Sequence, residues 1–344
     1  MEGGSAMHEY ELDDLTHLQR YDRTRLLERA GQHDLRVDAI ATAVAQAADR
    51  LEPSYAAGSA PLVVLALPAE LSGIGRALVS LLSHHFGQPL WLWQPDLPLD
   101  SLPRGALFLS ALPGSGQGAL TQGGPGQGTL VDLTAWISAE HHPAQTFLVL
   151  LGLLRRLAGP VDAKIDETTL EALLSFPGSQ LWPAHCAPDV PLRDNPAKQL
   201  AWHLHERVPL FWGEGPLAGV AVDWALRYQW YAEAMALGAS SGEMARMHVM
   251  ARLPRYWPNT VSLVRLQHGP ASPSGSAETL DYIFRRRRFT ARVVSAPADL
   301  PLPAAMVHLL ALGEWVALYA AILANVDPAD RVPLQLLEPP GNEI

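Results

Sequence analysis

Residues 208–224 combine a short apolar run, a glycine turn and a second apolar segment, an arrangement that suits phosphate binding. Val208–Trp212 has the length and composition of a buried strand, the turn 213–215 reads Gly-Glu-Gly, and helical spacing resumes at Leu217. A strand that leads through glycines into a helix leaves backbone N–H groups unpaired at the helix start, where they can donate to an anion. The carboxylate of Glu214 offers an alternative, because it can cap the helix and occupy the anion position itself.

Histidine and cysteine side chains do not form a recognisable metal site. His185, Cys186, His203 and His205 lie close together in the sequence, but their spacing fits no structural zinc pattern. With 13 histidines in the chain, such pairs arise by chance. A single cysteine also excludes an internal disulfide. We therefore expect neither a metal nor another cofactor.

The composition indicates a globular protein with two domains of ordinary size. The chain has 344 residues, of which 48% are hydrophobic and 17% are charged. Its net charge of −10 argues against nucleic-acid binding as the main activity. The arginine run 285–288 is interpreted first as a solvated helix end, and second as a dimer-interface or anion-binding patch. No basic-then-apolar leader or convincing membrane span is present, so we expect a cytoplasmic protein without a membrane partner.

Alternating apolar runs predict a parallel sheet with helices on both faces in each half of the chain. A glycine- and glutamine-rich segment, 113–128, is predicted to be a mobile loop. The predicted strands are 62–67, 90–93, 106–109, 208–212, 259–266 and 291–295. The predicted helices lie within 13–48 and at 77–82, 147–157, 167–174, 196–206, 217–237, 242–252, 277–288 and 304–325. The predicted divisions are N-terminal helices 1–48, a first α/β domain 49–180, a linker 181–195, a second α/β domain 196–336 and a tail 337–344.

Three segments resemble the two-SIS-domain bifunctional phosphoglucose/phosphomannose isomerase family. The most specific begins at Asn195-Pro-Ala-Lys198 and continues through 209–224, which is similar to the family's Pro-x-x-Tyr-Gly-x-Gly turn and Ala-x-x-Trp helix. Leu18–Asp22 resembles the leading helix of the family and 313–328 its closing helix. The resemblance implies two flavodoxin-like, SIS-type domains, each a parallel sheet flanked by helices, with a ligand at the carboxyl ends of the strands between the domains. It also implies a homodimer, for which the apolar helix 304–325 is the expected contact.

The same resemblance implies isomerisation of glucose 6-phosphate or mannose 6-phosphate to fructose 6-phosphate. This reaction needs a base, a proton donor that opens the sugar ring, and donors that hold the phosphate. Family members carry a catalytic glutamate on the helix at 217–237, where this chain has Trp230, and a histidine where this chain has Arg246. Glu243 and His248 are therefore the substitute candidates for acid and base. His248 lies in an apolar stretch, where a core histidine is the commoner outcome.

The predicted phosphate donors come from both halves of the chain. The family's first glycine-rich turn corresponds to a segment here that keeps Ser72, and its second loop corresponds to one that contains Ser110 and Ser115. Gly213 and Gly215 complete the predicted substrate-binding set, although serines and glycines also cluster in loops for structural reasons alone. Two functions follow. One is a sugar-phosphate isomerase with a rearranged acid–base pair, and the other is a non-catalytic sugar-phosphate-binding or regulatory protein.

Overall fold

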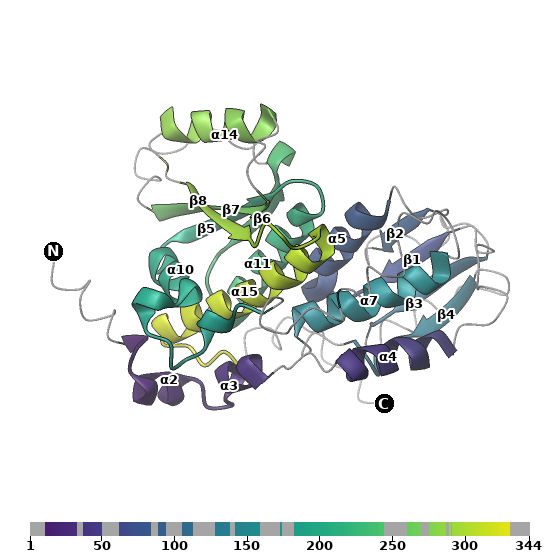
Figure 1. Ribbon diagram of the computed structural model, residues 1–344, viewed down its shortest axis with the longest axis horizontal. Helices are drawn as coiled ribbons and strands as arrows, with labels where there is room; N and C mark the ends of the chain where they lie inside the picture. The colour runs from purple at the N-terminus through teal and green to yellow at the C-terminus, as the bar shows by residue number, and fades with distance from the viewer. Residues whose placement is uncertain are drawn as a thin grey trace, which may run out of the picture.

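The structure, a computed structural model, contains two parallel four-stranded sheets with the same strand order (Figure 1). It describes residues 11–32, 37–49, 62–83, 89–93, 105–112, 128–137, 142–158, 173, 182–243, 260–269, 275–286, 289 and 291–330. The first sheet has the order β2-β1-β3-β4 and consists of β1 (Val63–Ala66), β2 (Leu90–Trp93), β3 (Ala106–Ser110) and β4 (Gly128–Asp132). The second has the order β6-β5-β7-β8 and consists of β5 (Val208–Gly213), β6 (Leu237–Ser240), β7 (Val261–His268) and β8 (Ala291–Ala296).

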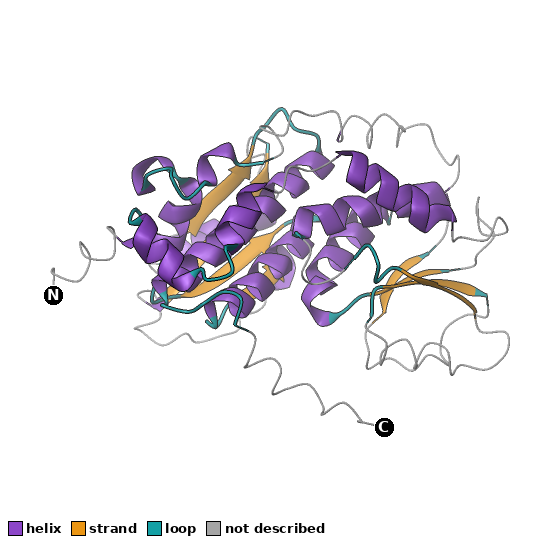
Figure 2. Cartoon of the chain, turned by 90° about the horizontal axis from the view of Figure 1, so that it is seen from below, coloured by secondary structure: helices purple, strands orange, loops and turns teal. Residues whose placement is uncertain are grey.

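Helices pack between and around the two sheets (Figure 2). Those of the first half are α2 (Leu15–Tyr21), α3 (Leu26–Gln32), α4 (Val37–Asp49), the 3₁₀ turn η2 (Ala69–Leu71), α5 (Ser72–Leu82) and α7 (Pro143–Ala158). The second half has the 3₁₀ turns η4 (Ala184–Cys186) and η5 (Leu192–Asp194), then α10 (Pro196–Leu204), α11 (Leu217–Ala232), α14 (Gly275–Arg286) and α15 (Leu302–Leu323). The predicted fold class, two α/β units that each contain a parallel sheet flanked by helices, is confirmed.

Two strands differ from the prediction. β4 begins at Gly128, the last residue of the segment predicted to be a mobile loop, and β6 begins at Leu237, the last residue of the helix predicted over 217–237; neither strand was predicted. That helix stops at Ala232, because Glu233 takes a left-handed conformation with φ of 50° and turns the chain into β6. The helix predicted at 242–252 is described only to Glu243, and of the one predicted at 167–174 only Leu173 is described.

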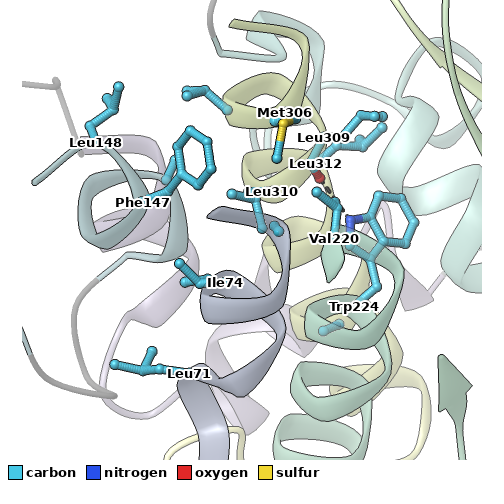
Figure 3. Packing of buried hydrophobic residues seen from close by; sticks show 14 of the residues in the cluster. Leu71, Ile74, Phe147, Leu148, Val220, Trp224, Met306, Leu309, Leu310 and Leu312 are labelled. Carbon is cyan, nitrogen blue, oxygen red and sulfur yellow. Dashed lines mark hydrogen bonds between the residues drawn. The ribbon is translucent and has the colours of Figure 1, made fainter. Parts of the chain in front are cut away.

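Helix α15 lies at the centre of the molecule rather than on its surface. It is long and apolar enough to cross a membrane, but 94% of its apolar window is buried by the rest of the chain. It contacts α3, α7, α10 and α11, so both halves share one core (Figure 3). The expectation that this helix joins two copies of the chain is therefore wrong, because its side chains are already covered. The homodimer itself stays a prediction.

The two halves meet through α5 and α11, the helices that follow the first strand of each sheet. A Cβ atom on Gly73 would lie 2.4 Å from the Asp223 backbone nitrogen, and one on Gly219 would lie 2.2 Å from the Ala77 backbone nitrogen. The paired positions are four residues apart on both helices and come in opposite order. The helices therefore run antiparallel with their backbones in contact, as the labelled residues of α5 and α11 in Figure 3 also show. Only glycine allows this approach.

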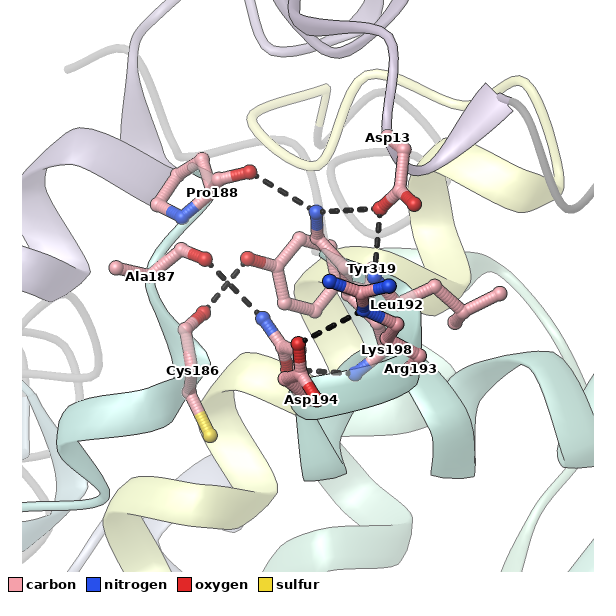
Figure 4. Close-up of polar contacts among 10 residues, drawn as sticks. Asp13, Cys186, Ala187, Pro188, Leu192, Arg193, Asp194, Lys198 and Tyr319 are labelled. Carbon is pink, nitrogen blue, oxygen red and sulfur yellow. Dashed lines mark hydrogen bonds and ion pairs between the residues drawn. The ribbon is translucent and has the colours of Figure 1, made fainter. Parts of the chain in front are cut away.

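The Asn-Pro-Ala-Lys motif has a structural role at the start of α10 (Figure 4). The side chain of Asn195 caps the helix by accepting from the Lys198 backbone N–H at 2.9 Å, and its amide donates to the Ala187 carbonyl at 3.1 Å. The buried Lys198 ammonium donates to Asp13 Oδ1 at 3.1 Å and to the Pro188 carbonyl at 2.9 Å. The motif thus ties the N-terminal segment to the second half of the chain.

Candidate functional site

At the carboxyl edge of the first sheet, Ser72 and Ser110 lie on neighbouring elements. Ser110 is the last residue of β3 and pairs in register with Ala66, the last residue of β1, after which the chain leads to Ser72 at the start of α5. The hydroxyl of Ser110 is buried and accepts from the Leu112 backbone N–H at 3.3 Å. The strand order reverses between β1 and β3, because β2 lies on one side of β1 and β3 and β4 lie on the other. In open α/β sheets the ligand usually binds at the carboxyl edge beside such a reversal. Ser115 lies outside the described residues.

Trp230 lies on the stripe of α11 that faces α5. Gly219 and Asp223 mark this stripe, and seven residues at 100° each bring position 230 to within about 20° of position 223. At a rise of 1.5 Å per residue, Trp230 lies about 10 Å beyond Asp223 along α11. This position is past the first turn of α5 and toward the carboxyl edge of the first sheet. The indole is 9% exposed and stacks on the Tyr231 ring at 5.9 Å between centroids. An aromatic side chain therefore fills the position at which the resemblance implies a base.

Two carboxylates beside α11 are committed to a buried arginine. Arg227 Nε donates to Asp223 Oδ2 and Arg227 Nη1 donates to Glu314 Oε2, both at 2.9 Å, and Tyr231 donates its hydroxyl proton to Glu314 Oε1 at 2.9 Å. Burial raises the pKa of Asp223 and works against the attraction of Arg227. Burial also opposes the charge on Arg227, but the two carboxylates outweigh it and raise the pKa of the guanidinium. Glu314 and Asp223 thus neutralise a core charge and are not placed to act as bases.

The glycine turn of the second half lies at the carboxyl edge of the second sheet. Gly213 is closely packed, because a Cβ there would lie 2.6 Å from the Leu217 carbonyl oxygen. Gly215 is exposed, has a φ of +53° and leaves open space where a side chain would be. The N-cap residue of α11 is Pro216, which supplies no side-chain hydrogen bond, whereas the backbone carbonyl of Glu214 accepts from Leu217 N–H at 3.1 Å. The N–H groups of Ala218 and Gly219 likewise donate to the carbonyls of Gly215 and Pro216, both at 3.1 Å. The first backbone N–H groups of α11 are therefore already paired, and they are not the free donors that the sequence predicts for an anion.

Glu243 lies at the same edge and forms a capping box. Its Oε2 accepts from the backbone N–H of Ser240 at 2.8 Å and from the Ser240 hydroxyl at 2.9 Å, while its own N–H donates to the Ser240 Oγ at 3.2 Å. Ser241 donates to the Gly213 carbonyl at 3.3 Å, which joins this segment to the glycine turn. The Ser-x-x-Glu spacing of 240–243 is a recognisable capping signal that the predictions above did not use. His248 lies outside the described residues.

The described candidates form two groups rather than one. Ser72 and Ser110 belong to the first sheet, and Gly213, Gly215 and Glu243 to the second. Because α5 and α11 run antiparallel, their N-termini point in opposite directions and lie about 10 Å apart along the helix axes. Within the described ranges, no group of three histidine, cysteine, aspartate or glutamate side chains is placed to hold a metal ion.

Comparison with known proteins shows a family match in the second half of the chain and a shared fold over most of its length. Residues 193–337 match the family described as the bacterial phospho-glucose isomerase C-terminal SIS domain. Over this segment, which is less than half of the chain, the sequence is similar to the SIS domain of bacterial phospho-glucose isomerases. The SIS-domain match begins just before the Asn-Pro-Ala-Lys motif and extends past α15, so it includes the glycine turn, α11 and Glu243.

Solved structures share the fold over most of the chain. A glucose-6-phosphate isomerase like protein from Thermus thermophilus is 22% identical, with a TM-score of 0.58 over 93% of this chain and 98% of that one. A putative phosphosugar isomerase from Clostridium difficile 630 is 10% identical, with a TM-score of 0.62 over 88% and 96%. A glucose-6-phosphate isomerase from Chlamydia trachomatis is 10% identical, with a TM-score of 0.57 over 86% and 71%. No curated protein sequence matches the chain.

Proposed function

We propose that this protein binds a hexose 6-phosphate and interconverts its aldose and ketose forms, with glucose 6-phosphate or mannose 6-phosphate and fructose 6-phosphate as substrates. The observation that carries the proposal is the match of residues 193–337 to an isomerase SIS domain. The serines at the edge of the first sheet carry hydroxyl groups of the kind that can donate to a phosphate.

In this proposal Glu243 and His248 share the proton transfers. Glu243 moves a proton between C1 and C2 of the sugar through an enediol, and His248 protonates the ring oxygen as the ring opens. Ser72 and Ser110 hold the phosphate through their hydroxyl groups. No external oxidant or reductant and no covalent intermediate is required, because C1 is reduced as C2 is oxidised within the same sugar through the enediol.

Trp230 favours a second candidate function, which is sugar-phosphate binding without turnover. The indole stands where the resemblance implies a base, Asp223 and Glu314 are paired with Arg227, and the Glu243 carboxylate is held by Ser240. A sensor or regulator of this kind keeps the phosphate donors and needs no general base.

A coupled assay separates the two functions. Fructose 6-phosphate is supplied, and glucose 6-phosphate formation is followed through NADPH production by an added dehydrogenase. If Glu243 is the base, Glu243→Gln lowers kcat by about 10²- to 10⁴-fold. Glu233→Gln, which changes an exposed carboxylate at the end of α11, leaves kcat unchanged and serves as the matched control.

Background turnover in the wild-type protein refutes the isomerase and leaves the binding function to be tested by thermal denaturation. A sugar phosphate present at 100 times its Kd stabilises the folded state by about 2.7 kcal/mol. The Ser110→Ala variant then shows a smaller shift of Tm than the wild type does. If fructose 6-phosphate, glucose 6-phosphate and mannose 6-phosphate all leave Tm unchanged, both functions are refuted.

A further inference from the structure

Three side chains that can carry positive charge belong to neighbouring elements at the amino end of the second sheet, away from the candidate site. His203 is in the last turn of α10, and Arg207 lies in the turn that connects α10 to β5. Arg292 is the second residue of β8. The chain topology brings these three elements together, because β5, β7 and β8 are adjacent and parallel.

Strand register places Arg292 on the face of the sheet that His203 contacts. His203 Nε2 and the hydroxyl of Ser262, the second residue of β7, are 2.9 Å apart. Val264, two residues along β7 from Ser262, points to the same face and pairs with Arg292 of β8. Arg292 therefore extends from the strand next to the one that His203 touches, on the same side of the sheet.

The charges in this cluster are not compensated. Arg207 and Arg292 are both exposed, and neither forms an ion pair with another side chain in the part of the chain that the structure describes. Burial and the two arginines, in that order, lower the pKa of His203 to about 4. The exposed Glu206 is adjacent in sequence, but it is not among the charges that shift this pKa. The positive potential stands out in a chain with a net charge of −10.

We propose that His203, Arg207 and Arg292 form a binding site for a small phosphate-bearing anion. Guanidinium groups match phosphate oxygens in a two-point geometry, and two guanidinium groups beside a histidine suit a dianion. Ser262 holds the imidazole in place. The site is separate from the candidate sugar-phosphate site, because Ser262 and the carboxyl end of β7 at His268 are six residues, or about 20 Å, apart. It does not depend on the proposed function.

Titration of His203 by NMR tests the site with inorganic phosphate as the probe. The His203 resonance is assigned by comparison with a His203→Gln variant, and its pKa is measured in phosphate and in chloride at equal ionic strength. Near pH 4 inorganic phosphate is a monoanion, which offsets part of the charge of the two arginines, so we expect the pKa of His203 to be measurably higher in phosphate than in chloride. Equal pKa values in the two salts overturn the proposal.

Substitution of the arginines shows whether the anion binds where proposed. Arg207→Gln and Arg292→Gln each remove one charge-assisted contact, and each is expected to weaken phosphate binding roughly tenfold. Arg193→Gln is the matched control, because Arg193 is equally exposed but already pairs with Asp194 at 3.1 Å. If the double variant Arg207→Gln/Arg292→Gln binds phosphate as tightly as the wild type, or the control weakens binding as much, the site is refuted.

Discussion

The backbone contact between α5 and α11 predicts that Gly219→Ala destabilises the protein. The added Cβ would lie 2.2 Å from the Ala77 backbone nitrogen, whereas ordinary contacts begin at about 3.4 Å. The helices must therefore separate by roughly 1 Å, and gaps of this size forfeit about a quarter to a half of the dispersion energy of the atoms that face them. Overpacking of this kind costs about 1–3 kcal/mol, and more where backbone meets backbone, while the better helix propensity of alanine returns up to about 1 kcal/mol.

We expect a net loss of about 1–2 kcal/mol in the free energy of unfolding, measured by urea denaturation with tryptophan fluorescence. Gly31→Ala is the control, because a Cβ at Gly31 would meet only the Trp315 ring at an ordinary distance of 3.6 Å. That variant gains helix propensity without a clash and is expected to be neutral or slightly stabilised. Gly73→Ala tests the same interface from the other side. The double variant should lose less than the sum of the single losses, since the first substitution already parts the helices. A stabilised Gly219→Ala protein refutes the antiparallel contact described above.

Three further predictions concern buried polar groups. Burial raises the pKa of Cys186 to about 12, so the thiol is expected to resist a thiol reagent at pH 8 in the folded protein and to react fully in urea; rapid labelling of the folded protein contradicts its burial. Glu314→Ala leaves Arg227 paired with Asp223 alone and removes the acceptor of both Arg227 Nη1 and the Tyr231 hydroxyl, so it should cost about 2–3 kcal/mol in urea denaturation. Tyr231→Phe removes one hydrogen bond and should cost about 1 kcal/mol; equal losses would argue against the ion network. The pKa of His203 is lowered in the folded state, so its contribution to the free energy of unfolding is present above pH 6.5 and is lost as the pH falls toward 4. The expected loss is about 1 kcal/mol, after allowance for the half-exposed ring. His203→Gln should remove this pH dependence.

The sequence predicts the sheets well where strands are long and apolar. β1, β3, β5 and β7 are continuous runs that both faces of a sheet bury, and each was predicted to within a few residues. β6 was missed because its sequence, Leu-Gly-Ala-Ser, contains one large apolar residue and follows a helix whose apolar spacing continues to its start. The conformation that ends this helix belongs to Glu233, a residue type that does not signal a left-handed turn.

The candidate site was harder to predict than the fold. The glycines at 213 and 215 predict a turn from the local sequence alone. The close contact at Gly73 and Gly219 forms only when two helices far apart in the sequence pack together, so the local sequence does not predict it. The pairing of Arg227 with Glu314 joins residues 87 positions apart, so no local pattern reports it. Ser240 and Glu243 did carry a local signal, the capping box, but Glu243 was assigned an acid–base role from the family resemblance instead.

The central position of α15 also has a consequence for biosynthesis. This helix is the last of the described elements to leave the ribosome, yet α3 and α7 from the first half pack against it. The nascent chain must therefore carry an unfilled apolar centre until residues 302–323 emerge, which is the condition under which incomplete chains aggregate or recruit chaperones. Emergence of α15, rather than completion of the first sheet, is then the event that allows the apolar centre to close.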